Sequence, residues 1–275
     1  MADDSRRETR SAFGSYAAIG DSFTEGVGDP GPGGVFVGWA DRLAVLLADR
    51  TPDGAAVDDP HHGSFRYANL AVRGRLLDQI VAEQIPRAKR LAPDLVTFCA
   101  GGNDIIRPGS DPDDVAERFE RALADLTSVV GTVMVPTGFD TRGVPVLRHL
   151  RGKIATFTAH VRSIADRHDC PVLDLWSLRS VQDRRAWDGD RLHLSPEGHT
   201  RVALRAAQVL GLDVPADPDQ PWPPLPPRGT LEVRRDDMQW AREYLVPWIG
   251  RRIRGESSGD HTVAKRPDLL PLTRH

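Results

Sequence analysis

The stretch Ile19-Gly20-Asp21-Ser22-Phe23-Thr24-Glu25-Gly26 decides how this chain is expected to fold. It continues a short apolar run, Tyr16 to Ile19, that is typical of a buried strand. Ser22 is therefore expected just beyond the C-terminal end of a strand, which in open α/β sheets is where ligands bind. A serine at that place can be a nucleophile if a base and an oxyanion site converge on it. Taken alone, Gly20-Asp21-Ser22 is more often a turn that caps a helix.

Three downstream blocks favour the catalytic interpretation. They are Ala71-Val72-Arg73-Gly74, Gly101-Gly102-Asn103-Asp104 and Asp190-Arg191-Leu192-His193. Together with Gly20-Asp21-Ser22-Phe23, and in this order, they resemble the sequence blocks of the SGNH (GDSL-like) hydrolase family over roughly Ser15 to Leu210. Phe23 stands where the family name has Leu, an exchange of apolar residues that is expected to pack rather than react. The α/β-hydrolase elbow G-x-S-x-G is absent, since Thr24 stands where its second Gly belongs.

The hydrophobic pattern predicts strands that alternate with helices. Strands are expected at about 15–20, 65–71, 94–100, 132–136 and 171–175, and helices at about 39–48, 76–90, 112–129, 146–167 and 196–210. Such alternation predicts a parallel sheet covered on both faces. The fold class expected is therefore α/β, a three-layer α/β/α sandwich with a five-stranded parallel sheet, and the family resemblance adds a flavodoxin-like strand order.

The chain divides into three predicted regions. Residues 1–14 are expected to be a flexible N-terminal arm and residues 15–212 the SGNH hydrolase domain. Residues 213–275 are expected to hold a proline-rich linker, an amphipathic helix at 237–254 and a disordered tail from Gly255. Seven prolines in 215–227 indicate a stiff strap.

Ser22, His193 and Asp190 are the candidate catalytic residues. The Ser22 hydroxyl is a weak nucleophile unless a base accepts its proton, and a histidine ionises near neutral pH. Asp190 precedes His193 by three residues, so a single turn can bring its carboxylate to the imidazole, where it would fix the tautomer. Asp188 is the rival partner, but its separation of five residues fits a single turn poorly.

Asn103 and Gly74 are the candidate oxyanion donors, together with the backbone N–H of Ser22. Asn103 offers a neutral amide, and Gly74 a backbone N–H that no side chain shields. These three groups match the oxyanion hole that the family resemblance implies. Asp21 and Asp104 are expected to brace the neighbouring loops rather than react.

Two other motifs are weaker. Gly26-Val27-Gly28-Asp29-Pro30-Gly31 matches the dinucleotide fingerprint G-x-G-x-x-G, but Pro30 and Pro32 interrupt the helix that the fingerprint requires. His61-His62 and the pair His193 and His199 match no zinc spacing. No metal and no organic cofactor is therefore expected.

Composition limits the class of protein. The chain has 275 residues and a formal net charge of −3, so no basic field indicates a nucleic-acid partner. Cys99 and Cys170 lie in or beside apolar runs and are expected to be buried free thiols. The polar N-terminus carries no signal sequence and no run approaches a membrane span, which predicts a cytoplasmic protein.

The function predicted is a serine esterase that forms an acyl-serine intermediate. By resemblance its substrates are carboxylic esters: lipid-like, aryl or acetylated-sugar esters. An acyltransferase using the same residues and a non-catalytic binding module of the same fold are the alternatives. The C-terminal helix, with Trp240, Tyr244, Trp248 and Ile249 roughly on one face, is expected to cover a groove of its own domain or of a second copy. Contact with a membrane surface is the less favoured interpretation.

Overall fold

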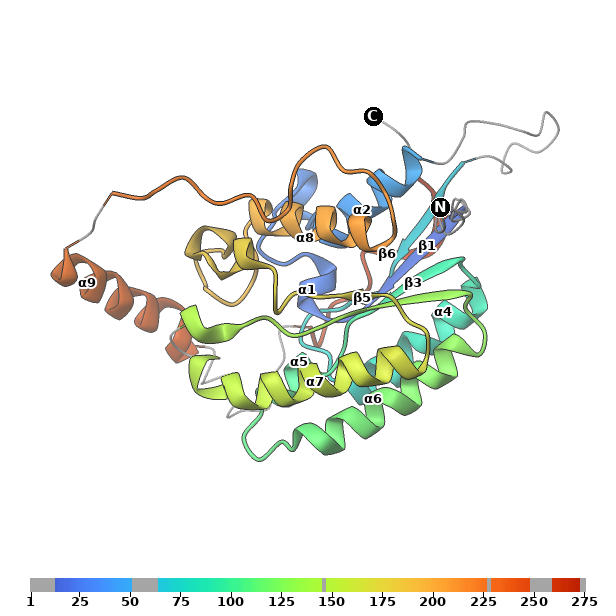
Figure 1. Cartoon of the computed structure of the whole chain (residues 1–275), viewed down its shortest axis with the longest axis horizontal. Helices are drawn as coiled ribbons and strands as arrows, with labels where there is room; N and C mark the ends of the chain where they lie inside the picture. The colour runs from blue at the N-terminus through green and yellow to red at the C-terminus, as the bar shows by residue number, and fades with distance from the viewer. Residues whose placement is uncertain (1–12, 51–63, 145–146, 227–228, 248–258, 273–275) are drawn as a thin grey trace, which may run out of the picture.

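The computed structural model describes residues 13–50, 64–144, 147–226, 229–247 and 259–272, and all statements below refer to these residues. Its centre is one sheet of six strands in the order β5-β4-β3-β1-β2-β6 (Figure 1). The strands are β1 Ser15–Ile19, β2 Arg66–Asn69, β3 Leu95–Phe98, β4 Thr132–Pro136, β5 Val172–Leu173 and β6 Arg266–Pro271. β1 to β5 are parallel, in the flavodoxin-like order 2-1-3-4-5, so this part of the prediction is confirmed.

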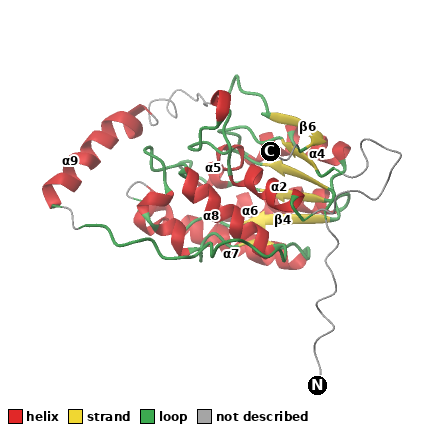
Figure 2. Cartoon of the chain, turned by 90° about the horizontal axis from the view of Figure 1, so that it is seen from above, coloured by secondary structure: helices red, strands yellow, loops and turns green. Residues whose placement is uncertain are grey.

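Helices cover both faces of the sheet (Figures 1 and 2). The α-helices are α1 Ser22–Glu25, α2 Trp39–Ala48, α3 Leu77–Glu83, α4 Ile85–Leu91, α5 Gly102–Ile105, α6 Pro112–Thr127, α7 Arg151–Arg167, α8 Pro196–Val209 and α9 Thr230–Trp240. Short 3-10 turns lie at Pro32–Gly34, Thr141–Gly143, Leu147–Leu150, Arg179–Gln182 and Arg184–Ala186, and a π-helical turn at Ala241–Leu245 continues α9. The three-layer α/β/α sandwich is therefore confirmed.

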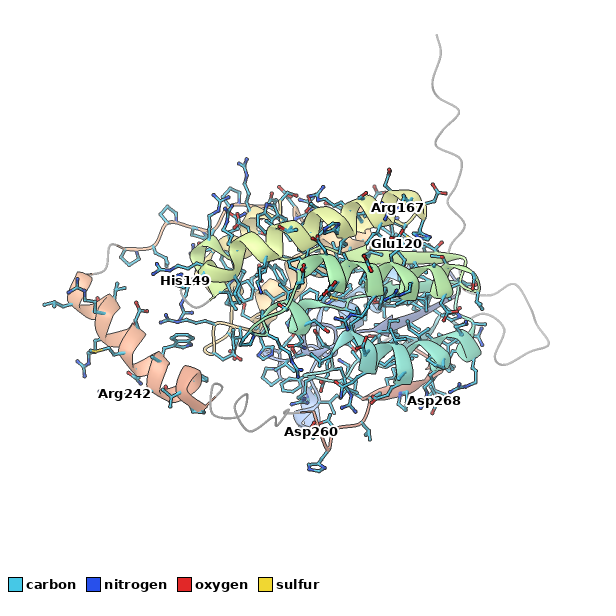
Figure 3. All side chains as sticks on the ribbon, turned by 90° about the horizontal axis from the view of Figure 1, so that it is seen from below. Glu120, His149, Arg167, Arg242, Asp260 and Asp268 are labelled. Atoms are coloured by element: carbon cyan, nitrogen blue, oxygen red, sulfur yellow. The ribbon has the colours of Figure 1, made fainter. Side chains whose placement is uncertain are left out.

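Strand alternation builds two separate cores. Ala17 and Ile19 of β1 face the layer of α3, α4, α6 and α7, whereas Tyr16 and Ala18 face the layer of α2 and α8. β1 is buried along its whole length, as expected of a central parallel strand. Glu120 of α6 and Arg167 of α7 form a surface ion pair across the outer layer (Figure 3). This packing holds the carboxyl ends of β1, β3 and β4 at one edge of the sheet.

The predicted helix at 76–90 is two helices. α3 ends before Gln84 and α4 begins at Ile85, because Pro86 has no N–H to continue the backbone ladder. The break turns the Gln84 side chain toward the end of β1, where it hydrogen-bonds to the backbone of Gly20.

The disordered tail predicted from Gly255 is wrong for residues 259–272. β6 pairs antiparallel with β2, with Arg66 opposite Pro271 and Tyr67 opposite Leu270, so the sheet has six strands rather than five. Two prolines lie in β6, which is tolerated because β6 is an edge strand.

The proline-rich strap lies against the hydrolase domain. Trp222 donates from Nε1 to Ser180 O at 2.8 Å and stacks under the guanidinium of Arg201 at 4.1 Å. Asp219 accepts from Ser180 N at 2.8 Å. The predicted helix at 237–254 begins earlier, at Thr230, and its predicted apolar residues Trp248 and Ile249 lie outside the described residues.

Candidate active site

Ser22 is the first residue of α1, directly after β1 and Gly20-Asp21. Asp21 is the N-cap of α1, and its Oδ1 accepts from Phe23 N at 3.1 Å. The Ser22 side chain is partly exposed, at the carboxyl edge of the sheet where the sequence predicts it. A serine so placed carries its hydroxyl on a rigid turn between a buried strand and a helix.

Gly20 allows this turn to lie close to the neighbouring strand. A Cβ at Gly20 would come within 2.5 Å of Thr24 Oγ1 and 2.8 Å of Cys99 O. The buried Gln84 side chain pairs with both backbone groups of Gly20, at 2.8 Å to its N and 2.9 Å to its O. The turn that carries Ser22 is thus fixed by a side chain that sequence analysis assigned only to a helix.

His193 and Asp190 form a close pair. The distance from His193 Nδ1 to Asp190 Oδ2 is 2.5 Å, and Asp190 Oδ1 accepts from the N–H groups of Leu192 and His193 at 2.9 and 3.0 Å. Burial acts to raise the pKa of Asp190, but its hydrogen bonds with His193 and Leu192 hold that pKa below the ordinary value. Asp188, the rival, is exposed and contacts His193 only through its backbone N–H. His193 Nε2 and Ser22 Oγ are not hydrogen-bonded within the described chain; such contacts often tighten only when substrate binds.

Two loops pack directly on each other. One is the loop at 26–31 that follows the candidate nucleophile Ser22, called the nucleophile loop below, and the other is the loop at 188–194 that carries His193. Gly28 has φ of 100°, and a Cβ there would lie 2.2 Å from Leu194 O and 3.2 Å from His193 Cβ. Only glycine fits such an approach. Gly28 therefore serves this contact, whereas Gly26 lies against Gly38 and Gly31 against Val37. The loop runs into a bridge between Pro30 and Phe36 rather than into the helix that a dinucleotide site requires.

Asn103 lies beside Asp21, at the start of α5. Its Nδ2 donates to Asp21 Oδ2 at 3.0 Å and to Arg75 O at 3.1 Å, so both amide hydrogens have partners. To stabilise an oxyanion, Asn103 would exchange the Arg75 carbonyl for the substrate oxygen and keep its bond to Asp21. Asp104 accepts from Leu77 N at 2.9 Å, which ties this loop to α3 and fits the predicted bracing role.

Gly74 lies in a turn with φ of 75°. The preceding residue, Arg73, donates its N–H to Glu25 Oε2 at 2.6 Å and its Nε to Glu25 Oε1 at 3.1 Å. Glu25 belongs to α1 and is buried. The same side chain therefore fixes the Gly74 turn to the helix that carries Ser22, a role without a sequence signal beyond its position in the first block.

Lys265 fastens the other side of α1. Its Nζ donates to Glu25 O at 2.6 Å, Phe36 O at 2.8 Å and Asp41 Oδ2 at 2.6 Å. Lys265 immediately precedes β6, so the C-terminal segment reaches the nucleophile helix. Sequence analysis missed this residue because it lies in a stretch predicted to be disordered.

The Asp21 carboxyl is buried, and burial is the largest influence on its pKa. Burial raises the pKa of the Asp21 carboxyl to about 6, although the Phe23 N–H and the charge of His193 act in the opposite direction.

Burial lowers the pKa of His199 to about 3. His199 Nδ1 accepts from Trp39 N at 3.2 Å, so its Nε2 carries the hydrogen that faces Val27 O at 3.3 Å. His199 is therefore a neutral structural residue.

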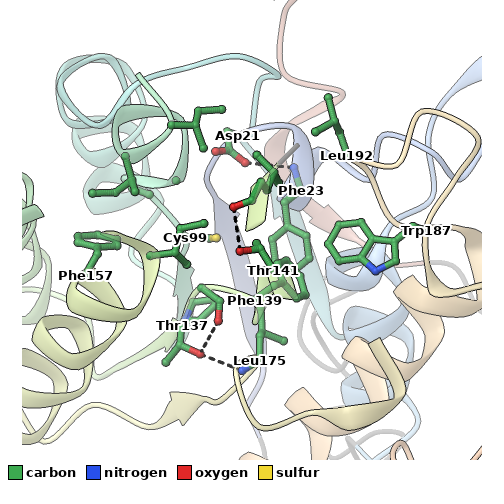
Figure 4. A pocket seen from close by; sticks show the side chains of 18 residues that line it. Asp21, Phe23, Cys99, Thr137, Phe139, Thr141, Phe157, Leu175, Trp187 and Leu192 are labelled. Carbon is green, nitrogen blue, oxygen red and sulfur yellow. Dashed lines mark hydrogen bonds between the residues drawn. The ribbon is translucent and has the colours of Figure 1, made fainter. Parts of the chain in front are cut away.

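A mostly apolar pocket of about 160 Å³ opens beside Asp21 and Leu192 (Figure 4). Phe157 and Trp187 lie on opposite sides of it. Phe23 packs edge-on against Phe139, with ring centroids 5.2 Å apart, and Phe139 packs in the same way against Trp187 at 5.2 Å. Cys99, a partly exposed free thiol, also lines the pocket, whereas Cys170 is buried and free.

Two absences predicted from the sequence concern a metal site and a membrane span. Among the described residues, no group of three or more histidine, cysteine or acidic residues could hold a metal ion, and His61 and His62 lie outside these residues. None of the helices that the structure describes has the length and apolar character of a membrane span.

Fold and site together define a class: a three-layer α/β/α hydrolase with a serine after the first strand and an aspartate–histidine pair before the last helix of the sandwich. The family model described as GDSL-like Lipase/Acylhydrolase matches residues 18–201. The chain therefore belongs to that family and is an ester-hydrolysing enzyme, as the sequence predicts.

Solved structures share this fold. LAE5, an α/β hydrolase from the metagenome of Lake Arreo, Spain, is 22% identical over 72% of this chain and 94% of its own, with a TM-score of 0.57. A tryptophan-to-isoleucine variant of Axe2, an acetyl xylan esterase from Geobacillus stearothermophilus, is 19% identical over 74% of this chain and 97% of its own, with a TM-score of 0.57. Catalytic mutants of Axe2 replace a serine, an aspartate or a histidine by alanine. A search of curated proteins finds no match.

Proposed function

We propose that the chain is a serine esterase in which Ser22 forms an acyl-enzyme intermediate. The close pair of Asp190 and His193, on a loop packed against the nucleophile loop, is the observation that carries the proposal. The Axe2 mutants, which mark a serine, an aspartate and a histidine as catalytic in that enzyme, support it.

The proposed reaction has two halves. His193 Nε2 accepts the Ser22 proton while Oγ attacks the ester carbonyl carbon, and the oxyanion accepts from the N–H groups of Ser22 and Gly74 and from Asn103. Collapse of this intermediate breaks the bond to the alcohol, which leaves with the proton from His193. A water molecule then attacks the acyl-serine, with His193 again as base, and releases the acid and free Ser22. Asp190 orients the imidazole and stabilises its charged form.

The pocket supports esters with an apolar acyl or aryl group. Its volume of about 160 Å³ is close to that of an engineered apolar cavity in another protein that binds benzene, at about 150 Å³. A ring or a short chain therefore fits better than a sugar, whose hydroxyls would lose their water without gaining partners from Phe139, Trp187 or Phe157. We expect acyl chains longer than acetyl and shorter than palmitoyl to be preferred.

Two measurements test the proposal. A panel of p-nitrophenyl esters from acetate to palmitate gives the chain-length preference, and a fluorophosphonate probe with mass spectrometry identifies the reacting residue. We expect Ser22→Ala and His193→Ala each to abolish turnover with the fold intact, and the double variant to be little worse than either single one. Near-normal turnover by Ser22→Ala would exclude the serine mechanism. Absence of both probe labelling and ester turnover in the wild type would favour the binding-module alternative, whereas labelling of Ser22 without ester turnover would favour the acyltransferase.

A further inference from the structure

The loop that carries Asp190 and His193 is held on two sides. An antiparallel bridge between Trp187 and Leu194 closes its base. On one side lies the nucleophile loop, through Gly28. The other side faces α9 and the π-helical turn that follows it, from the far end of the chain.

One face of this C-terminal helix contacts the loop at successive turns. Trp240 Nε1 donates to the carbonyl oxygen of Asp190 at 2.9 Å. One turn earlier, Asp237 Oδ1 accepts from Arg191 Nη1 at 2.6 Å. One turn later, the Tyr244 hydroxyl lies over the loop, 3.3 Å from where a Cβ at Gly189 would be. Spacings of three, four and seven residues place the three side chains on one helix face.

Arg191 is the strained residue of the loop. Its φ is 58°, a left-handed conformation that is unfavourable for a residue other than glycine. It stands between Asp190 and the two N–H groups that bind the Asp190 carboxylate, so the strain is part of the geometry that presents Oδ2 to His193. Its buried side chain stacks under the Trp240 ring at 4.8 Å and pairs with Asp237. Arg191 is thus fixed in its left-handed conformation by groups of α9.

The rest of α9 is mostly in solvent. Leu231 and Met238 are 81% and 58% exposed, whereas Trp240 is 8% exposed. α9 lies at one end of the molecule, and Arg242, in the π-helical turn that follows it, lies away from Glu120 of α6 and Arg167 of α7 (Figure 3). The docked face is therefore concentrated on the Asp190–His193 loop, and little of α9 contributes to the domain core.

We propose that α9 is a positioning element of the active site: Trp240 and Asp237 hold the 188–193 loop in the conformation that aligns Asp190 with His193. This inference rests on the proposed function. Neither residue touches substrate; both act through Arg191 and the Asp190 backbone. Within one chain, the helix docks on the 188–193 loop of its own domain.

The test uses three single variants of the full chain. Trp240→Phe removes the Nε1–H and keeps a ring beside Arg191, Asp237→Asn weakens the ion pair, and Met238→Ala is the matched control on the exposed face of the same helix. Steady-state kinetics on the best p-nitrophenyl ester are recorded from pH 5 to 9, with turnover normalised to the folded fraction measured by circular dichroism.

We expect Trp240→Phe and Asp237→Asn each to lower kcat roughly threefold to tenfold, the equivalent of one lost hydrogen bond, with KM unchanged within about twofold. The acidic limb of the kcat/KM profile should move to lower pH, because a misaligned Asp190 carboxylate stabilises the protonated form of His193 less. The decrease in kcat of the double variant should be smaller than the product of the two single decreases, since both changes act on one loop. Asp21 and His199 also act electrostatically on His193, and none of the variants touches them.

Two outcomes would overturn the inference. One is that the kinetics of Trp240→Phe and Asp237→Asn equal those of Met238→Ala, whether or not all three lose activity; the other is a loss of thermal stability with kcat and the pH profile unchanged. The second would show a structural role only. If the wild-type chain itself does not turn over esters, the proposed function fails, and the positioning idea falls with it for that separate reason.

Discussion

At the scale of single residues, the site holds a carboxylate under unfavourable conditions. Asp21 is buried, and its pKa is raised to about 6 in the folded protein from an ordinary value of 3.8. The folded chain therefore binds the proton more tightly than the unfolded chain. The contribution of Asp21 to stability therefore falls as pH rises from about 4 to about 6, and its full penalty is present above that range.

Asp21→Asn should therefore stabilise the fold at pH 8, by up to about 3 kcal/mol, while impairing catalysis. The penalty of ionising a buried carboxyl disappears, but Asn103 loses the carboxylate that accepts from its amide. Urea unfolding of both proteins at pH 8 and at pH 4 checks this, because the gain should shrink at the lower pH. Equal unfolding free energies at pH 8 would contradict the account of Asp21.

Asn103→Ala should lower kcat by about 10²–10³ and change KM little, since an oxyanion donor acts mainly in the transition state. Steady-state kinetics separate the two parameters. An increase in KM at constant kcat would instead make Asn103 a substrate-binding residue, held by Arg75 O and Asp21.

At the scale of elements, regular amphipathic patterns made most of the sandwich predictable. The helix predicted at 39–48 has those bounds in the structure, and the strand at 132–136 likewise. The pair of Asp190 and His193 was predictable because three residues of separation suffice to join them within one turn. Features that depend on residues close together in the chain, such as single helices and strands and the pair of Asp190 and His193, can therefore be predicted from the sequence.

Contacts between distant segments left no such pattern. Gln84, at the break between α3 and α4, hydrogen-bonds to the backbone of Gly20. The helical periodicity of this segment does not indicate that contact. β6 contains two prolines and charged residues, which locally disfavour a strand, and only its pairing with β2 defines it. Trp240 was recognised as a docking residue, but its target, the Asp190 carbonyl, lies fifty residues away.

Lys265→Met tests the contribution of the C-terminal segment. The variant leaves two carbonyls and part of Asp41 without their ammonium partner and should lower the free energy of unfolding by about 2–3 kcal/mol. Lys89→Met is the matched control, because Lys89 forms a surface ion pair with Asp125 and should contribute no more than about 1 kcal/mol. Denaturant titrations of both variants give the comparison. Similar decreases in the free energy of unfolding of the two variants would mean that the contacts of Lys265 do not stabilise the fold more than a surface ion pair does.

At the scale of the whole molecule, acid should weaken the fold through His199. Its pKa is lowered to about 3 in the folded protein against 6.5 ordinarily, so the unfolded chain gains the proton first. This contribution to stability is complete above pH 6.5 and is lost as pH falls from there toward 3. His199→Gln should be less stable than the wild type at pH 7, yet lose less stability between pH 6.5 and pH 4. Parallel pH profiles for the two proteins would exclude this origin of acid sensitivity.

The edge strand β6 also has a consequence for biosynthesis. A ribosome releases the sheet strands in chain order, so β1 to β5 and the three candidate catalytic residues emerge long before Lys265 and β6. Until those last residues are free of the exit tunnel, β2 is an open edge that can pair with another nascent chain, and the nucleophile helix lacks its clamp. A fusion partner joined after β6 lets Lys265 and β6 leave the tunnel while the partner is still being translated. Such fusions should therefore mature faster than fusions at the N-terminus, and chains stalled before Lys265 should be the ones that aggregate.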